Sequence, residues 1–422
     1  MPTLARLSAP GVLLVIFQSM VSVGDTYFVG RLGTAPLAGL ALVFPLIMLL
    51  QMTSAGAMGG GVSSAIARAL GSGNLAAARR LVIHALVIAT GMGLAFTVLV
   101  VSFGPAVYRL LGGSGETLEN AARYSTVVFS GAITVWMANT LSNLLRGTGN
   151  MLTPAIALIG AAVVHVPLSA TLVSRIGIAG AGIAYVTTFG LAALAMAAVV
   201  FRRSSALRPT RADLGLEWPL FREILRVGAI SVLSSFQTVL TAVILTGFVG
   251  RYGAAALAGY GVGLRLELLQ IPLVFAVGQA MVVLVGTTIG AGRPERAKRI
   301  AWIGSVFAAS ISLAIGIGAW LAPLAWVGLF SSDPAVLESG TAYLRNVALF
   351  YPMLACNIAL YFASQGAGKV LLPVLAGTAR LAIVIAGGAL AASLGGIFAV
   401  IAVAMAVSGL LTIWFVARTD WT

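Results

Sequence analysis

Two carboxylates lie deep inside long apolar stretches of this sequence, where ionisable groups are costly and rare. They are Asp25 and Glu267. A carboxylate withdrawn from water takes up and releases a proton, or it binds a cation. Asp25 is therefore predicted to be a functional group, and the alternative is a salt bridge or a carboxylate that reaches the membrane interface. Arg265 and Glu267 are two positions apart and do not face each other on a helix, so Arg380 is the expected partner of Glu267. Glu267 is then either a functional acid or half of a structural ion pair.

A histidine and a serine share one face of another apolar stretch. His165 and Ser169 are four positions apart, which is one helical turn. Histidine titrates near neutral pH, so His165 is a candidate proton-binding group, with Ser169 beside it. The alternative for His165 is a packing role in the core. His84 has no polar companion in its stretch and is predicted to be structural.

Several amide, tyrosine and acidic side chains inside the apolar stretches are candidates for lining a substrate cleft. Amides in a membrane hydrogen-bond across helices or face a wet cavity, and tyrosine rings stack on cations. These candidates are Gln51, Asn139, Tyr185, Gln237, Glu267 and Tyr351. The sequence contains no zinc motif, phosphate loop or nucleophile elbow. We therefore predict no catalytic residue, resident metal or cofactor, and the protein is not expected to be an enzyme.

The composition indicates how these residues are positioned. The chain has 422 residues, of which 60% are hydrophobic and 9% charged, whereas a soluble domain has about 25% charged residues. Twelve apolar stretches, the first at 7–29 and the last at 394–417, are long enough to cross about 30 Å of hydrocarbon as helices. Helices satisfy their own backbone groups in lipid. The predicted fold class is an all-α polytopic membrane protein.

The sequence of the first half recurs in the second half. Residues 30–39 and 250–259 are identical at seven of ten positions, and later glycine, arginine and proline positions recur at an offset of 219. Each half holds six predicted spans, so the repeats are parallel and are expected to surround a central cleft. We predict an N-terminal six-helix bundle over 1–201, a cytoplasmic linker over 202–223 and a C-terminal six-helix bundle over 224–422.

The net charge of +14 resides in the loops between spans. Seventeen basic residues lie on the side of both termini and six on the other side, so both termini are expected in the cytoplasm. This distribution argues against nucleic acid as a partner and for contact with membrane lipids. The single cysteine allows no intramolecular disulfide. The arginine-rich composition favours a bacterial inner membrane, and a monomer is expected.

Four strings resemble those of the MATE (multidrug and toxic compound extrusion) family, part of the multidrug/oligosaccharidyl-lipid/polysaccharide exporter superfamily. They are GDTYFVGRLG at 24–33, ARALGSGN at 67–74, LRGTGN at 145–150 and IAGAGIA at 178–184. The resemblance implies two six-helix bundles around a cleft. It also implies export of organic cations or amphipathic drugs against an inward H⁺ or Na⁺ gradient.

The resemblance also assigns roles to individual positions. The family's span-one aspartate, its proton or cation site, falls on Asp25, so Na⁺ binding there is the alternative to proton binding. Its span-five Asn-x-x-x-Asp pair falls on His165 and Ser169, so both members are replaced. A polar residue of span six falls near Tyr185 and Thr188, and the acid of span seven found in some members falls near Gln237. Loss of an amide and a carboxylate favours H⁺ as the coupling ion.

The predicted function is therefore secondary active efflux by antiport with H⁺, or Na⁺, through alternating access. The main alternative is a lipid or lipid-linked oligosaccharide flippase. Such a flippase would need several basic residues for an anionic headgroup, and only Arg265 and Arg380 lie inside spans. A membrane sensor or scaffold is the third reading, and it would not need Asp25.

Overall fold

A computed structural model describes residue 7, residue 21 and residues 23–421, and nearly all of these residues are helical. Within this part of the chain, ten helices are long and apolar enough to cross a membrane, or eleven if one bent pair forms a single span. The predicted first span, 7–29, lies largely outside the described residues. The predicted all-α fold class is confirmed.

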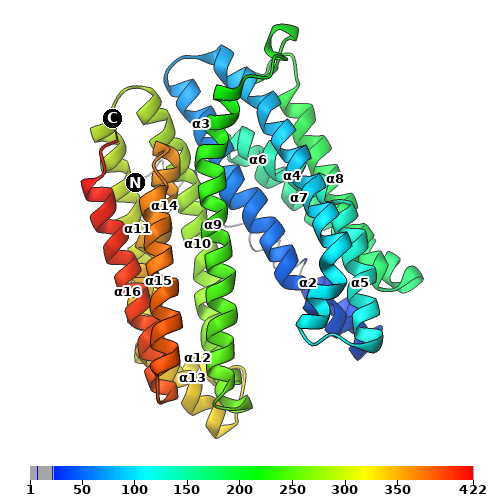
Figure 1. The fold of residues 1–422 in the computed structure, drawn as a ribbon, viewed down its shortest axis with the longest axis vertical. Helices are drawn as coiled ribbons and strands as arrows, with labels where there is room; N and C mark the ends of the chain where they lie inside the picture. Colours follow the sequence, from blue (N-terminus) through cyan, green and yellow to red (C-terminus); the bar gives the residue numbers. More distant parts are fainter. Residues whose placement is uncertain (1–6, 8–20, 22, 422) are drawn as a thin grey trace. The chain divides into compact units, whose positions relative to one another are not determined.

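The chain divides into two compact units, which we call the N-terminal unit (Ala9–Ala229) and the C-terminal unit (from Ile230 onward). The N-terminal unit contains a helical stretch over residues 23–30 and seven α-helices that are labelled in Figure 1: α2 (Thr34–Gln51), α3 (Gly59–Gly71), α4 (Leu75–Leu110), α5 (Gly115–Ser130), α6 (Ala132–Gly147), α7 (Leu152–Ile176) and α8 (Ile178–Val200). It also contains the short helical segments η1 (Met52–Met58) and η2 (Arg211–Asp213).

The division falls inside α9 (Trp218–Gly250), shortly after residue 224, where the second bundle was expected to begin. The C-terminal unit then contains α10 (Ala254–Gly290), α11 (Pro294–Leu321), α12 (Pro323–Val327), α13 (Pro334–Val347), η3 (Ala348–Phe350), α14 (Tyr351–Ala367), α15 (Leu371–Leu390) and α16 (Leu394–Arg418).

The sequence repeat is visible as a repeated helix contact. A methyl group added at Gly147 in α6 would lie 2.8 Å from the Cβ of Ile66 in α3. At an offset of 219, a methyl group added at Gly366 in α14 would lie 3.0 Å from the Cβ of Val285 in α10. Each contact needs a glycine, because any larger residue would separate the two helices. The two units therefore use the same small-residue packing at corresponding places.

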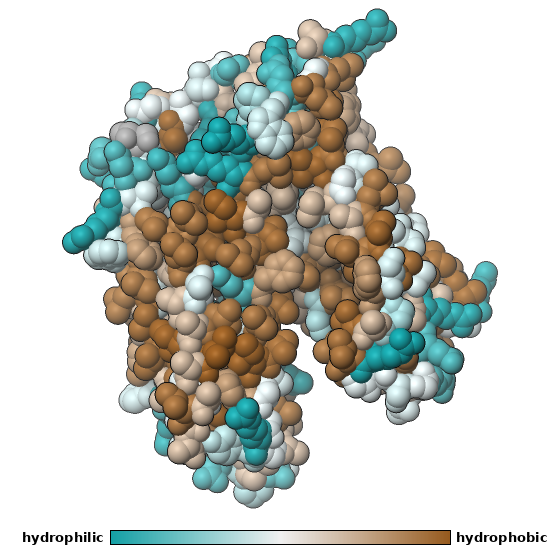
Figure 2. All heavy atoms as spheres, in the orientation of Figure 1, coloured by the Kyte–Doolittle hydropathy of each residue, from teal (hydrophilic) through white to brown (hydrophobic). Residues whose placement is uncertain are grey.

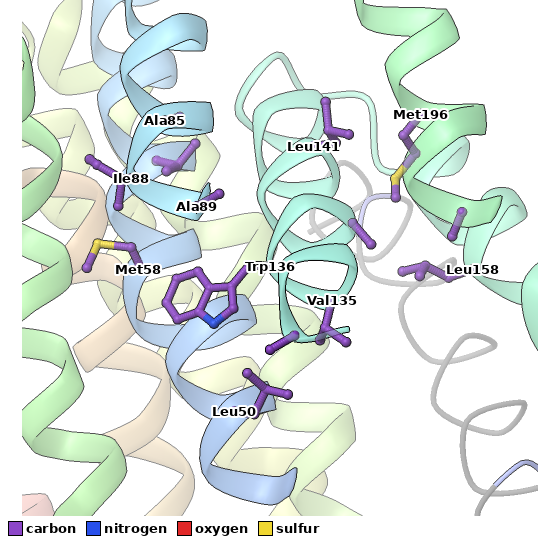
Figure 3. Packing of buried hydrophobic residues seen from close by; sticks show 14 of the residues in the cluster. Leu50, Met58, Ala85, Ile88, Ala89, Val135, Trp136, Leu141, Leu158 and Met196 are labelled. Atoms are coloured by element: carbon purple, nitrogen blue, oxygen red, sulfur yellow. The ribbon is translucent and has the colours of Figure 1, made fainter. Parts of the chain in front are cut away.

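The apolar residues are divided between a packed interior and the outer flanks of the helices. Trp136 in α6 is fully buried, and Figure 3 shows its indole with Leu50, Met58 and Ala89 around it. Other large apolar side chains, such as Leu110 and Leu194, are exposed. Figure 2 shows hydrophobic atoms over the flanks of the helices in each unit and hydrophilic atoms toward their ends. Exposed apolar flanks are what lipid contact requires.

A seven-residue π-helical segment, η1 (Met52–Met58), joins α2 to α3 without a break in the span. π-helical turns are rare and often occur at functional sites, because they redirect side chains and free backbone carbonyls. Here Asn143 of α6 donates to the carbonyl of Ala55 at 3.2 Å, and Asn139 donates to Ser54 Oγ at 2.8 Å. The segment is thus held against α6 by Asn139 and Asn143, two buried polar residues of that helix.

Candidate functional site

Three of the predicted residues form one buried polar cluster in the N-terminal unit. His165 Nε2 lies 2.9 Å from Oδ1 and 3.0 Å from Oδ2 of Asp25. Ser169 donates its hydroxyl to Asp25 Oδ1 at 2.6 Å. The exposed fractions of Asp25, His165 and Ser169 are 7%, 2% and 0%. The carboxylate therefore meets both side chains of the predicted pair away from solvent.

The α7–α8 hairpin positions this cluster. Gly177, with φ at 68°, forms the tight turn between the two helices. Gly180 allows α8 to approach α7 closely, because a methyl group added there would lie 2.3 Å from the carbonyl carbon of Leu172. Thr188 of α8 consequently reaches α7, where its Oγ1 lies 3.2 Å from His165 Nδ1. His165 is held by a polar partner on each side of its ring.

Thr188 contacts the ring nitrogen of His165 that faces away from Asp25. When the Thr188 hydroxyl donates to the carbonyl of Ala184 at 2.8 Å, its oxygen accepts from His165 Nδ1 as the N–H of the ring. When the hydroxyl donates to Nδ1 instead, the ring proton is on Nε2. The second nitrogen, Nε2, faces the two carboxylate oxygens of Asp25.

This arrangement requires one proton between His165 Nε2 and Asp25. A neutral imidazole meets this requirement with its single N–H on Nε2 and an ionised Asp25. With one more proton, the pair is an imidazolium with a carboxylate or a neutral imidazole with a carboxylic acid. The cluster therefore offers a buried place for one additional proton.

The donor set suits a proton better than Na⁺. The imidazole contacts both oxygens of Asp25 and Ser169 contacts one of them, so the carboxylate is engaged by nitrogen and hydroxyl donors. A sodium ion requires several free oxygen ligands instead. Within the described part of the chain, no group of three or more His, Cys, Asp or Glu residues gathers to hold a metal ion.

Three more of the predicted residues form a second cluster in the same unit. Gln51 donates to the Tyr185 hydroxyl at 2.6 Å, and Asn139 donates to Gln51 Oε1 at 3.0 Å. Tyr185 and Thr188 are neighbours on α8, and both Tyr185 and Tyr124 of α5 lie within electrostatic range of Asp25. The two clusters are therefore adjacent. Tyr124 was missed by sequence reasoning, because a tyrosine in an amphipathic helix carries no signal of its own.

The remaining predicted residues lie in the C-terminal unit. Gln237 of α9 donates to Thr378 Oγ1 at 2.7 Å. Glu267 of α10 accepts a hydrogen bond from the Tyr343 hydroxyl at 3.0 Å. Tyr351 is fully buried, within electrostatic range of Glu267.

The expected ion pair of Glu267 with Arg380 is not formed. Among the described residues, no ion pair within 4.0 Å includes either side chain. Arg380 affects Glu267 only through a longer-range charge interaction. The close partner is Tyr343, which sequence reasoning missed because one tyrosine of α13 is not distinguished from the others by spacing.

The fold and the site together define a class: a multi-span helical membrane protein with two repeated halves, one of which buries a carboxylate–imidazole pair. The chain belongs to the MatE family, whose family model matches residues 10–171 and 231–390. The predicted resemblance to MATE proteins is thereby confirmed.

Two curated relatives match most of the chain. It is 25% identical over 379 residues to the probable multidrug resistance protein NorM of Thermotoga maritima, covering 88% of this chain and 81% of the relative. It is 26% identical over 369 residues to the FAD transporter of Shewanella oneidensis, covering 86% and 80%.

Solved structures show the same fold. An outward-facing multidrug resistance MATE transporter of the MOP superfamily matches with a TM-score of 0.91 and 22% identity, over 98% of this chain and 94% of that one. A MOP superfamily transporter from Pyrococcus furiosus matches with a TM-score of 0.88 and 22% identity, over 99% and 96%. These likenesses confirm the predicted fold class of twelve transmembrane helices in two repeats.

Proposed function

We propose that this protein is a secondary active exporter of organic cationic or amphipathic compounds, driven by inward movement of H⁺ and working by alternating access. The observation that carries the proposal is the contact of His165 Nε2 with both oxygens of Asp25, at 2.9 and 3.0 Å. Asp25 and His165 together carry the coupling proton, and Ser169 orients the carboxylate. The multidrug names of several relatives support the class of cargo.

The coupling step follows from the chemistry of the pair. A proton arriving at the pair cancels its net negative charge. Loss of that proton restores the negative charge, and a cationic substrate is then favoured near the Asp25 carboxylate. Proton and organic cation thus compete for one negative charge, which is what antiport requires. Gln51, Asn139 and Tyr185 stand beside the pair and are the candidates for contacting the substrate.

Location and surroundings are part of the same proposal. The protein resides in a bacterial inner membrane as a monomer, with both termini in the cytoplasm and lipid along its apolar flanks. The excess of basic residues in the loops on one side supports this orientation.

The test compares gradients in proteoliposomes. Uptake of a fluorescent organic cation is measured under a pure pH gradient and under a pure Na⁺ gradient, for the wild type and Asp25→Asn. We expect uptake under the pH gradient alone, and none with Asp25→Asn. Glu119→Gln, at an exposed carboxylate of α5, is the matched control and should transport normally. Uptake driven only by Na⁺ would overturn proton coupling.

Two further measurements separate the alternatives. Transbilayer movement of labelled lipid, without movement of the organic cation, would indicate a flippase. The similarity to the FAD transporter of Shewanella oneidensis makes FAD a third cargo to offer to the same vesicles. FAD is anionic and would gain nothing from a bare Asp25 carboxylate, so we expect no FAD uptake.

A further inference from the structure

His84 of α4 is a fully buried histidine that the proposed coupling mechanism does not use. Its two ring nitrogens have two different backbone partners. Nδ1 lies 2.8 Å from the carbonyl oxygen of Arg80, and Nε2 lies 2.8 Å from the backbone N–H of Glu217. A carbonyl oxygen can only accept and a backbone N–H can only donate. His84 is therefore neutral in this structure, with its proton on Nδ1 and a lone pair on Nε2.

The second of these contacts holds the linker segment, which we define as residues 201–217, against α4. The segment joins α8 of the first repeat to α9, which leads into the second repeat. Arg80 forms an ion pair with Glu217, and Arg79 Nε donates to the carbonyl of Ala206 at 3.1 Å. Leu207 is buried. His84 was predicted to be structural and to have no polar companion in its own stretch, and its partner lies 133 residues away in the sequence.

Asp213 lies in the same linker segment. Hydrogen bonds from the hydroxyl and backbone N–H of Thr210 hold the pKa of its carboxyl below the ordinary value of 3.8, which is below the range of about pH 5 to pH 8 in which histidine titrates. The charged residues on the segments around His84 are Arg68, Arg79, Arg80, Arg146, Arg202, Arg203, Arg208, Arg211, Asp213, Glu217, Arg222, Glu223 and Arg226.

We propose that His84 is a pH-sensitive latch for the linker segment. A second proton on the ring would occupy Nε2 and turn it into a donor that faces the Glu217 N–H, another donor. The hydrogen bond between them is then lost, and a buried imidazolium remains beside the Arg80 guanidinium. The protonated ring and the linker segment must separate, so the segment leaves α4 as the pH falls. Phe221, in the first turn of α9 just after the segment, packs its ring on His84 with centroids 4.5 Å apart and loses this partner as well.

The consequence is a regulatory device that is independent of Asp25. The segment is the covalent connection between the two repeats, so its release changes the link through which they move. On the orientation proposed above, the latch faces the cytoplasm. A transporter that imports protons would then loosen its own connecting segment when the cytoplasm becomes acidic.

The experiment measures the mobility of the linker segment directly. A spin label is placed at exposed position 204 (Ser204→Cys) in a Cys356→Ala background, so that the protein has a single thiol. Spectra of the full chain in detergent are recorded from pH 7.5 to pH 5.5. We expect the mobile fraction to rise by about fivefold or more, as loss of one buried hydrogen bond predicts.

Variants of the two histidines in the chain show which of them causes the change in label mobility. His84→Gln keeps an oxygen acceptor for the Glu217 N–H but does not titrate, so its label should stay immobile across the range. His165→Gln, the matched control, should retain the wild-type transition. An unchanged wild-type spectrum, or the same rise in His84→Gln, would overturn the proposal. If His84→Gln is misfolded at pH 7.5, His84→Asn and the His165→Gln comparison still decide it. None of these readouts depends on transport, so failure of the latch and failure of proton coupling are distinguishable.

Discussion

The hydrogen bond from Ser169 to Asp25 should couple these two residues energetically. The bond is 2.6 Å long and both residues are buried. A hydrogen bond to a charged group contributes about 1.5–3 kcal/mol to stability, and one between neutral groups about 0.5–1.5 kcal/mol. Ser169→Ala should therefore lower the free energy of unfolding by about 1.5–3 kcal/mol in the wild type. In an Asp25→Asn background the loss should be about 0.5–1.5 kcal/mol, because only a neutral acceptor remains.

The assay is a double-mutant cycle on purified protein unfolded in mixed detergent micelles at neutral pH. The expected coupling energy between Ser169→Ala and Asp25→Asn is about 1–2 kcal/mol. Ser174→Ala is the matched control, since Ser174 is exposed on the same helix and donates to the carbonyl of Thr171 at 2.8 Å. Its coupling to Asp25→Asn should be close to zero. A coupling energy of zero between Ser169→Ala and Asp25→Asn, or an equal coupling energy between Ser174→Ala and Asp25→Asn, would refute the inferred contact.

Three other predictions follow from the same geometry. His165→Gln should fold and bind substrate but lose uptake driven by a pH gradient in proteoliposomes, because glutamine donates to the carboxylate without a titrating proton; normal uptake would exclude His165 as a proton carrier. Gly180→Ala should lower the free energy of unfolding by about 1–3 kcal/mol, because the added methyl group overpacks the contact between the two helices. Gly160→Ala should not lower it, because Gly160 has open space around it. Equal melting temperatures for the two variants would contradict the prediction. Because the pKa of Asp213 is lowered, its stabilisation of the linker segment is present above the ordinary carboxyl pKa and is lost only as the pH falls through the lowered value. In a His84→Gln background, Asp213→Asn should therefore make a spin label at position 204 mobile at neutral pH. With Asp213 intact, the label should stay immobile until the pH falls below about 3.8. Identical pH profiles with and without Asp213→Asn would contradict this role of the carboxyl.

Much of the polar cluster could be predicted from the sequence. The four-residue spacing of His165 and Ser169 placed both on one face of a helix, and burial of a carboxylate in an apolar stretch singled out Asp25. The contact between them joins positions about 140 residues apart, which spacing alone does not determine. It was reached through the resemblance, and the structure supplies its geometry.

Other contacts could not be predicted from the sequence, for a physical reason. The side chains that meet Gln51 and Glu267 come from helices whose rotation is set by packing, and packing depends on the whole chain. The partner of His84 is a backbone N–H of the linker segment, which side-chain patterns do not reveal. The π-helical segment at Met52–Met58 is a further case. Its sequence has no distinctive pattern, and its hydrogen bonds to two asparagines of α6 become visible only in the folded unit.

The measurement that most directly tests the central claim is proton release from purified protein when substrate binds. A saturating organic cation is added in weakly buffered solution, and the pH change is recorded by a calibrated indicator. The account predicts release of roughly one proton per bound substrate in the wild type and none in Asp25→Asn, with no dependence on Na⁺. Binding without proton release, or equal release from Asp25→Asn, would contradict the claim that Asp25 and His165 carry the coupling proton.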